Sequence, residues 1–128
     1  MSKQVVRTER APAPFQGAPY SQAVVHDDLV FVAGQIGIDP QTNEVVEGGI
    51  RAQTEQAMKN LAAILEAAGS SLANVLKTSI FLVDFGDFSA MNEVYASYVG
   101  PDFPARATVQ IAGLPSGALV EIEVVAHL

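Results

Sequence analysis

The sequence contains no cysteine, and among its 128 residues only His26 and His127 are histidines. Without cysteine, the chain can form neither a disulfide nor a thiolate metal ligand, and it has no cysteine nucleophile. The two histidines lie near opposite ends of the chain, without the spacing of a metal site or the serine and acidic neighbours of a catalytic triad. These absences exclude cysteine chemistry and give no support to a metal site.

Basic residues are also scarce, because 14 acidic residues stand against 7 lysines and arginines, for a net charge of −7. The lysines, Lys3, Lys59 and Lys77, are scattered along the chain, whereas nucleic-acid-binding proteins cluster their basic residues. Gly48 and Gly49 are not followed by the Gly-Lys-Ser/Thr sequence of a phosphate-binding loop. We therefore expect no nucleic-acid partner.

Long apolar runs are missing as well. No run approaches the roughly 18 residues of a membrane span, and residues 1–4 show no apolar signal region. Hydrophobic residues make up 49% of the chain and charged residues 16%, which is typical of a compact globular protein. We expect one domain over residues 1–128, a cytoplasmic location and no membrane partner. The low charged fraction indicates that another subunit covers part of the surface.

Strand and helix patterns follow one another along the chain. β-Branched and aromatic residues between turn residues predict strands over 4–8, 20–25, 29–33, 75–83, 105–111 and 119–127. Apolar residues three and four apart predict helices over 50–68 and 88–98, with Gly69 just beyond the first and Asp87 capping the second. This order predicts an α+β fold, with a single mixed β-sheet and both helices on one face. We expect self-association to cover the other face.

The charged residues Arg106 and Glu121 stand in the closing strands, which otherwise have the apolar pattern of a sheet core. Of the four arginines only Arg106 lies in such a strand, and a charge there costs free energy unless it is paired or used. Paired as a hairpin, the strands can place Arg106, Thr108 and Gln110 on the same face as Glu121. This face is either a solvated surface, the commoner arrangement, or a site where Arg106 clamps a small organic acid and Glu121 orients a water.

Three other positions, Tyr20, Gly34 and Asn92, each have a structural and a functional explanation. Tyr20 can pack a loop onto the core or line a pocket. Gly34 ends a strand, where a missing side chain permits close approach of a backbone or ligand. Asn92 lies within a helix although asparagine is a mediocre helix former. The structural explanation is the more common one for each residue.

Short motifs in a fixed order give these positions a common context. They are Ala18-Pro19-Tyr20-Ser21-Gln22-Ala23, Val32-Ala33-Gly34-Gln35-Ile36-Gly37, Asn60-Leu61 with Glu66-Ala67-Ala68-Gly69, Val75-Leu76-Lys77-Thr78, Asp87-Phe88 with Met91-Asn92-Glu93-Val94-Tyr95, Phe103-Pro104-Ala105-Arg106-Ala107-Thr108 and Val120-Glu121-Ile122-Glu123. Over nearly its whole length the chain resembles the RidA family, also called YjgF or endoribonuclease L-PSP-like.

The resemblance implies a chorismate-mutase-like fold and a homotrimer, with ligand sites in the clefts between subunits. It implies a 2-iminobutanoate/2-iminopropanoate deaminase, which hydrolyses enamine and imine products of pyridoxal-phosphate enzymes to 2-oxo acids and ammonia. It implies neither a cofactor nor a metal for this hydrolysis. The expected partners are a small 2-imino or 2-oxo acid and two further copies of the chain.

The resemblance of the motifs implies family roles for individual residues of this chain. Arg106 matches the arginine that binds the substrate carboxylate, and Glu121 matches the glutamate that orients the attacking water. Tyr20 and Asn92 match pocket residues, and Gly34 matches the glycine whose backbone approaches the ligand.

Thr108 and Ala33 match pocket positions with a changed residue. Thr108 stands where the family often has cysteine, and Ala33 stands where active deaminases often carry serine. Ala18 replaces a common glycine, and Gly113 replaces a frequent basic residue. The lost hydroxyl at Ala33 bears on substrate range and rate.

Other activities stay open from the sequence. One is a non-enzymatic, small-carboxylate-binding or chaperone-like trimer that keeps the arginine clamp. Another is a family member that acts on a different imine, enamine or amide. RNA cleavage, which one family name suggests, is disfavoured by the acidic balance of the chain.

Overall fold

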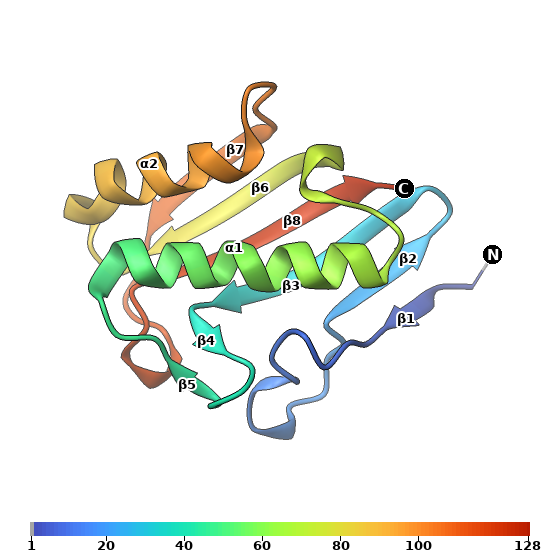
Figure 1. Cartoon of the computed structure of the whole chain (residues 1–128), viewed down its shortest axis with the longest axis horizontal. Helices are drawn as coiled ribbons and strands as arrows, with labels where there is room; N and C mark the ends of the chain where they lie inside the picture. The colour runs from blue at the N-terminus through green and yellow to red at the C-terminus, as the bar shows by residue number, and fades with distance from the viewer. Residues whose placement is uncertain (1) are drawn as a thin grey trace.

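The computed structural model describes residues 2–128, so Met1 of the expected domain lies outside it. Six strands form a mixed sheet in the order β1-β2-β3-β8-β6-β7. Helices α1 (Gly49–Ala67) and α2 (Phe88–Val99) lie side by side on one face of this sheet (Figure 1). The predicted α+β fold, with a mixed sheet and two helices on one face, is confirmed.

The strands lie close to their predicted positions. They are β1 (Gln4–Val6), β2 (Ala23–His26), β3 (Leu29–Ile36), β6 (Val75–Leu82), β7 (Ala105–Gln110) and β8 (Val120–His127). A second sheet of two short strands, β4 (Ile38–Asp39) and β5 (Glu44–Val45), was not predicted as a separate unit. No helix within residues 2–128 combines the length and the apolar character that a membrane crossing requires.

The two closing strands do not form the predicted hairpin, because β6 lies between them. β7 pairs in parallel with β6, and β8 pairs antiparallel with the other edge of β6. Helix α2 connects β6 to β7, and such a helical crossover allows two successive strands to pair in parallel. This long-range pairing occupies the edge that a β7–β8 hairpin would need.

The strand register places Arg106 and Glu121 on opposite faces of the sheet. Thr78 pairs with both Arg106 and Val124, so these side chains share the face that the helices cover, where Thr78 and Val124 are buried. Glu121 pairs with Phe81 and points to the other face. The expectation that one chain places Arg106 and Glu121 on a common face is therefore wrong.

The helix boundaries can be compared with the ends and caps that the sequence predicted. α1 buries its apolar stripe, including Met58, Leu61 and Ile64 at 0% exposure, and Gly69 follows with a left-handed φ of 88°, as predicted. Asp87 does occupy the N-cap of α2, but its side chain makes no capping hydrogen bond. Asp84 accepts one from the Gly86 N–H at 2.8 Å instead, and so caps the 3₁₀ turn that precedes α2.

The sheet face opposite the helices carries large apolar side chains. Val5, Phe31 and Val109 are 45%, 42% and 47% exposed, and the register places them on the face of Glu121. Large apolar side chains that are exposed together on one face are a common feature of protein–protein interfaces. The expectation of self-association across this face stays a prediction.

Candidate functional site

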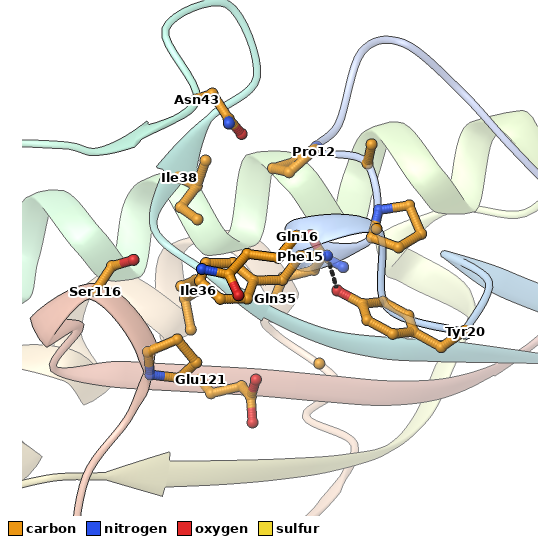
Figure 2. A pocket seen from close by; sticks show the side chains of 15 residues that line it. Pro12, Phe15, Gln16, Tyr20, Gln35, Ile36, Ile38, Asn43, Ser116 and Glu121 are labelled. Atoms are coloured by element: carbon orange, nitrogen blue, oxygen red, sulfur yellow. Dashed lines mark hydrogen bonds between the residues drawn. The ribbon is translucent and has the colours of Figure 1, made fainter.

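A cavity of about 430 Å³ lies beside Glu121 (Figure 2). Tyr20, Gly34 and Glu121, which the sequence singled out, all line it. The remaining lining residues come from the 12–17 loop, the end of β3, strand β4 with the turn that follows it, and the turn before β8; they are Pro12, Ala13, Pro14, Phe15, Gln16, Gly17, Gln35, Ile36, Ile38, Asn43, Pro115 and Ser116. We call this cavity the carboxylate pocket, after the side chain of Glu121.

A β-bulge explains how Glu121 reaches this pocket. The pairing of β3 with β8 shifts between Val32 and Gln35, so that Ala33 and Gly34 form the irregular step. A Cβ atom at Gly34 would lie 2.7 Å from Cδ of Glu121, closer than real Cβ contacts. Gly34 therefore provides the space that the carboxyl group of Glu121 occupies, whereas the sequence indicated only a close approach of some kind.

The electrostatic surroundings of Glu121 raise the pKa of its carboxyl group above the ordinary 4.5. Burial is the larger cause, and the negative charge of Glu123 is the smaller one. Arg106 is not among the causes, which agrees with its place on the other face of the sheet. A carboxyl group with a raised pKa accepts and returns a proton more readily near neutral pH than an ordinary one.

Tyr20 is held by the loop that leads to it. Its hydroxyl oxygen accepts a hydrogen bond from the Phe15 N–H at 2.6 Å, which Figure 2 shows as a dashed line. The hydroxyl proton is therefore free to be donated to a molecule in the carboxylate pocket. Because the ring is 44% exposed, this hydrogen bond is an important part of what orients it.

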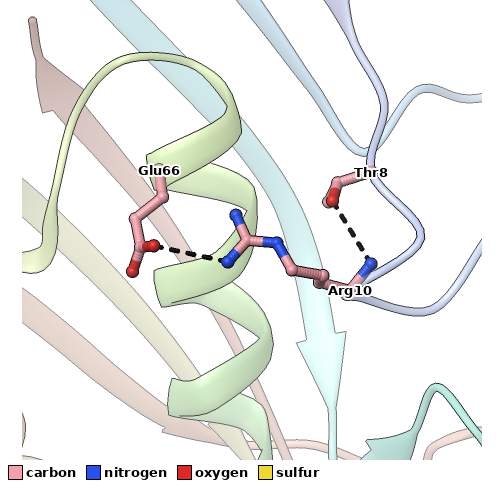
Figure 3. Close-up of polar contacts among 3 residues, drawn as sticks. All are labelled: Thr8, Arg10 and Glu66. Atoms are coloured by element: carbon pink, nitrogen blue, oxygen red, sulfur yellow. Dashed lines mark hydrogen bonds and ion pairs between the residues drawn. The ribbon is translucent and has the colours of Figure 1, made fainter.

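Buried Gln22, which the sequence gave no reason to select, fixes the start of the same loop. Its side-chain oxygen accepts from the Thr8 N–H at 2.8 Å, and its amide nitrogen donates to the Pro12 carbonyl at 2.8 Å. Thr8 also accepts from the Arg10 N–H, and the Arg10 guanidinium lies 3.4 Å from the Glu66 carboxylate of α1 (Figure 3). That ion pair is exposed and contributes little, so the Gln22 amide is the main anchor.

A second hollow, of about 320 Å³, lies on the helix side of the sheet beside Arg106. Asn92 of α2 and Phe103 line it together with Arg106. Among residues 2–128 no carboxylate forms an ion pair with Arg106. Its guanidinium carbon lies instead 5.2 Å from the ring centre of Tyr95 and 5.5 Å from that of Phe88. We call this hollow the guanidinium pocket.

Two buried acceptors accompany Arg106. Oδ1 of Asn92 and Oγ1 of Thr108 have no hydrogen-bond partner within the described chain. Such groups cost free energy when they stay unpaired, and they are typical of sites that a ligand completes. Thr108 lies two residues after Arg106 on the same face of β7.

Two predicted site residues, Ala33 and Thr108, line neither pocket, although Thr108 lies on the same face of β7 as Arg106. Ala33 is the more distant of the two from Arg106 in the sheet order. It lies in a neighbouring hollow with Tyr20 and Phe31, and its N–H donates to the Gln22 carbonyl at 2.9 Å. In residues 2–128 no three His, Asp or Glu side chains lie close enough together to hold a metal ion. The sequence-predicted residues thus form two groups, Tyr20, Gly34 and Glu121 in one and Asn92, Arg106 and Thr108 in the other.

Known proteins have similar sequences and the same fold. Residues 8–128 match the family described as Endoribonuclease L-PSP. The chain belongs to this family. A RutC family protein from Pyrococcus horikoshii is 50% identical over 125 residues, which cover 98% of each chain. The human protein named 2-iminobutanoate/2-iminopropanoate deaminase is 45% identical over 124 residues, covering 97% of this chain and 89% of its own.

Solved structures agree with these relatives. The crystal structure of RidA from an Antarctic Psychrobacter species superposes with a TM-score of 0.93 at 45% identity, covering 98% of this chain and 99% of that one. The crystal structure of E. coli TdcF with bound serine superposes with a TM-score of 0.90 at 35% identity, covering 98% of each chain. The arrangement of helices and sheet is therefore that of the RidA family.

Replacing Gly34 by alanine tests the close approach to Glu121. The φ of Gly34 lies outside the left-handed region, so alanine suits the backbone, but its methyl group must displace the flexible Glu121 side chain. We expect Gly34→Ala to change the free energy of unfolding by less than about 1 kcal/mol while clearly shifting the carboxyl resonance and the titration of Glu121 in ¹³C NMR. Gly113→Ala, where no atom lies within 4 Å, is the control and should leave that resonance in place.

The raised pKa of Glu121 also predicts how stability depends on pH. The folded protein binds this proton more tightly than the unfolded chain, so ionisation of Glu121 destabilises the fold as pH rises through the raised pKa. We expect Glu121→Gln to be more stable than the wild type at pH 7, with the difference vanishing below pH 4.5, the ordinary carboxyl value. Urea unfolding at several pH values measures this. Glu44→Gln, an exposed site, corrects for the lost charge, and equal gains from both variants at pH 7 would contradict the prediction.

Proposed function

We propose that the chain is a deaminase that hydrolyses small 2-imino acids, such as 2-iminobutanoate and 2-iminopropanoate, to 2-oxo acids and ammonia. The observation that carries the proposal is the Arg106 guanidinium, which has no carboxylate partner among residues 2–128 and lines an open hollow. A planar guanidinium with free N–H groups is suited to bidentate binding of a carboxylate. The human relative, named for its action on two imino acids, supports the same substrate class.

We further propose that the working enzyme is a chorismate-mutase-like homotrimer, with each site formed between two subunits. Within one chain, Arg106 and Glu121 lie on opposite faces of the sheet, so one subunit cannot offer both to the same small molecule. Arg106 lies on β7, an edge strand, where an adjacent copy has access to it. The apolar sheet face around Val109 supplies a surface for this association.

In the proposed reaction, Arg106 of one subunit binds the substrate carboxylate through two parallel hydrogen bonds. Glu121 of the next subunit holds a water against the C=N carbon and takes its proton as the C–O bond forms. Glu121 returns this proton to the nitrogen, which gives a carbinolamine. It then moves the hydroxyl proton to the nitrogen as the C=O bond forms, and the C–N bond breaks to release ammonia and the 2-oxo acid. Fixing the imine and the water together lowers the entropic part of the barrier.

The other pocket residues have supporting roles in this proposal. The Tyr20 hydroxyl, whose oxygen already accepts from Phe15, is able to donate its proton to the ligand. Oδ1 of Asn92, a residue that lines the guanidinium pocket, accepts an N–H bond from the imine or from the departing amine. This acceptor gains its partner when the ligand is bound.

A second candidate is a deaminase for a different imine or enamine. Ala33 favours it, because this position presents a methyl group where the resemblance leads us to expect a serine hydroxyl in many active deaminases. Ala33 also lies outside the carboxylate pocket, so its side chain would act at the periphery of the site. Comparing the rates for imines of different side-chain length separates the two candidates.

Substitution of Arg106 tests the proposed function. We expect Arg106→Ala to lower kcat/KM for 2-iminobutanoate by at least about a hundredfold, because the substrate carboxylate loses its charge-assisted bidentate contact with the guanidinium. Arg106→Lys should also be strongly impaired, since an ammonium cannot reproduce the planar fork. The measurement follows imine decay with semicarbazide trapping, in preparations whose circular dichroism matches the wild type.

The wild type must also bind and turn over for the proposal to hold. Calorimetric titration with 2-oxobutanoate should show binding that Arg106→Ala abolishes. Wild-type rates from Arg106→Ala would contradict the clamp. Binding of 2-oxobutanoate without any imine hydrolysis would instead favour a non-catalytic carboxylate-binding protein.

A further inference from the structure

The Arg106 guanidinium is held by two aromatic rings rather than by an acid. Its central carbon lies 5.2 Å from the ring centre of Tyr95 and 5.5 Å from that of Phe88. Phe88 and Tyr95 stand seven residues apart on α2, so both rings project from the same side of the helix toward β7. Both distances lie within the roughly 6 Å range in which a cation is attracted to an aromatic face.

The two rings are themselves fixed by contacts beneath them. Tyr95 is only 4% exposed, and its hydroxyl donates to Oγ1 of buried Thr78 at 2.9 Å. Burial raises the pKa of Tyr95, so the phenol stays protonated and neutral at physiological pH. Thr78 also pairs with Arg106 across the β6–β7 ladder, which ties ring and guanidinium to the same place in the sheet.

Phe88 is supported from the other side. Its ring stacks on that of Phe85, with centres 4.7 Å apart and planes 16° apart. The Phe85 N–H donates to Oε1 of Gln110 at 2.7 Å, and Gln110 belongs to β7, the strand of Arg106. Phe88 is therefore supported, through Phe85 and Gln110, by the strand that carries Arg106. These contacts fix the start of α2 relative to β7.

Aromatic rings can hold the Arg106 guanidinium without occupying its N–H groups, whereas a carboxylate cannot. A carboxylate beside Arg106 would occupy its N–H groups and compete with the substrate for them. A ring face attracts the cation through its π-electrons and leaves the N–H groups at the guanidinium edge free. A mobile arginine side chain loses conformational entropy when a ligand orders it, and this loss weakens binding. An arginine that is already ordered in the free protein avoids this entropy cost.

We propose that Phe88 and Tyr95 are positioning residues that order the Arg106 guanidinium in the free enzyme, with its N–H groups available to a carboxylate. This inference rests on the proposed function for its consequence in catalysis, but the ordering itself is a property of the free protein. Because the carboxylate is bound alike in the ground state and the transition state, losing this order should raise KM and leave kcat largely unchanged.

The test uses paired variants of the full chain. Phe88→Leu and Tyr95→Leu remove one ring each, whereas Phe88→Tyr and Tyr95→Phe keep a ring at each position. Tyr98→Leu is the matched control for loss of an aromatic side chain, because Tyr98 lies on the same helix and its ring is not one of the two that the Arg106 guanidinium contacts. Thermal unfolding identifies any variant that does not fold, and Phe88, being only partly buried, is the position that best tolerates leucine.

The first readout is the ¹⁵N relaxation of the Arg106 Nε–H group in the absence of any ligand. We expect an ordered guanidinium in the wild type, Phe88→Tyr, Tyr95→Phe and Tyr98→Leu, and a mobile one in Phe88→Leu. The second readout is steady-state hydrolysis of 2-iminobutanoate together with the Kd of 2-oxobutanoate. Phe88→Leu should raise KM and Kd roughly three- to tenfold, with kcat within about twofold.

The outcomes separate this inference from the proposed function. An Arg106 side chain that is as ordered in Phe88→Leu as in the wild type would overturn the inference, whatever the activity. So would an unchanged Kd in a variant whose Arg106 has become mobile. A wild type with an ordered Arg106 that neither binds 2-oxobutanoate nor hydrolyses the imine would overturn the proposed function alone.

Discussion

The parallel pairing of β7 with β6 is the constraint on which the candidate site depends. It inserts β6 between the two closing strands and directs Arg106 and Glu121 to opposite faces of the sheet. A single subunit therefore presents a cation and a carboxylate that cannot neutralise each other. In our proposal these two groups meet only across a subunit boundary, so the site would exist only in the assembled protein.

Each half of the proposed site is already formed within a single chain. On one face, the bulge at Gly34 makes room for Glu121, and burial raises the pKa of its carboxyl group. On the other face, Arg106 lies against two rings and has no acidic partner within residues 2–128. Keeping the guanidinium and the carboxylate apart leaves both available for a ligand and a water.

Local patterns in the sequence predicted the local structure well. The apolar stripe and Gly69 located α1 because helix formation depends on neighbours three and four residues away. The pairing of β7 could not be read in this way, since it depends on which strands meet after α2 crosses the sheet. Asp87 lies at the predicted N-cap of α2 without making a capping hydrogen bond, and Asp84 caps a preceding 3₁₀ turn that the sequence analysis did not predict.

The sequence singled out individual candidate residues but not their arrangement in space. Arg106 and Glu121 stood out because charges are rare in apolar strands. Tyr20, Gly34 and Asn92 stood out more weakly, and the family resemblance favoured a functional role for them. Gln22, Phe88 and Tyr95 carry no such signal, because a buried amide and a helical aromatic are ordinary core residues in any sequence.

Activity of mixed trimers tests the shared site most directly. Arg106→Ala and Glu121→Gln, each inactive alone, should regain about one quarter of wild-type activity when unfolded together and refolded in equal amounts, because one contact in four joins an intact Arg106 to an intact Glu121. A mixture that stays inactive, although mixed trimers form, would contradict a site shared between subunits.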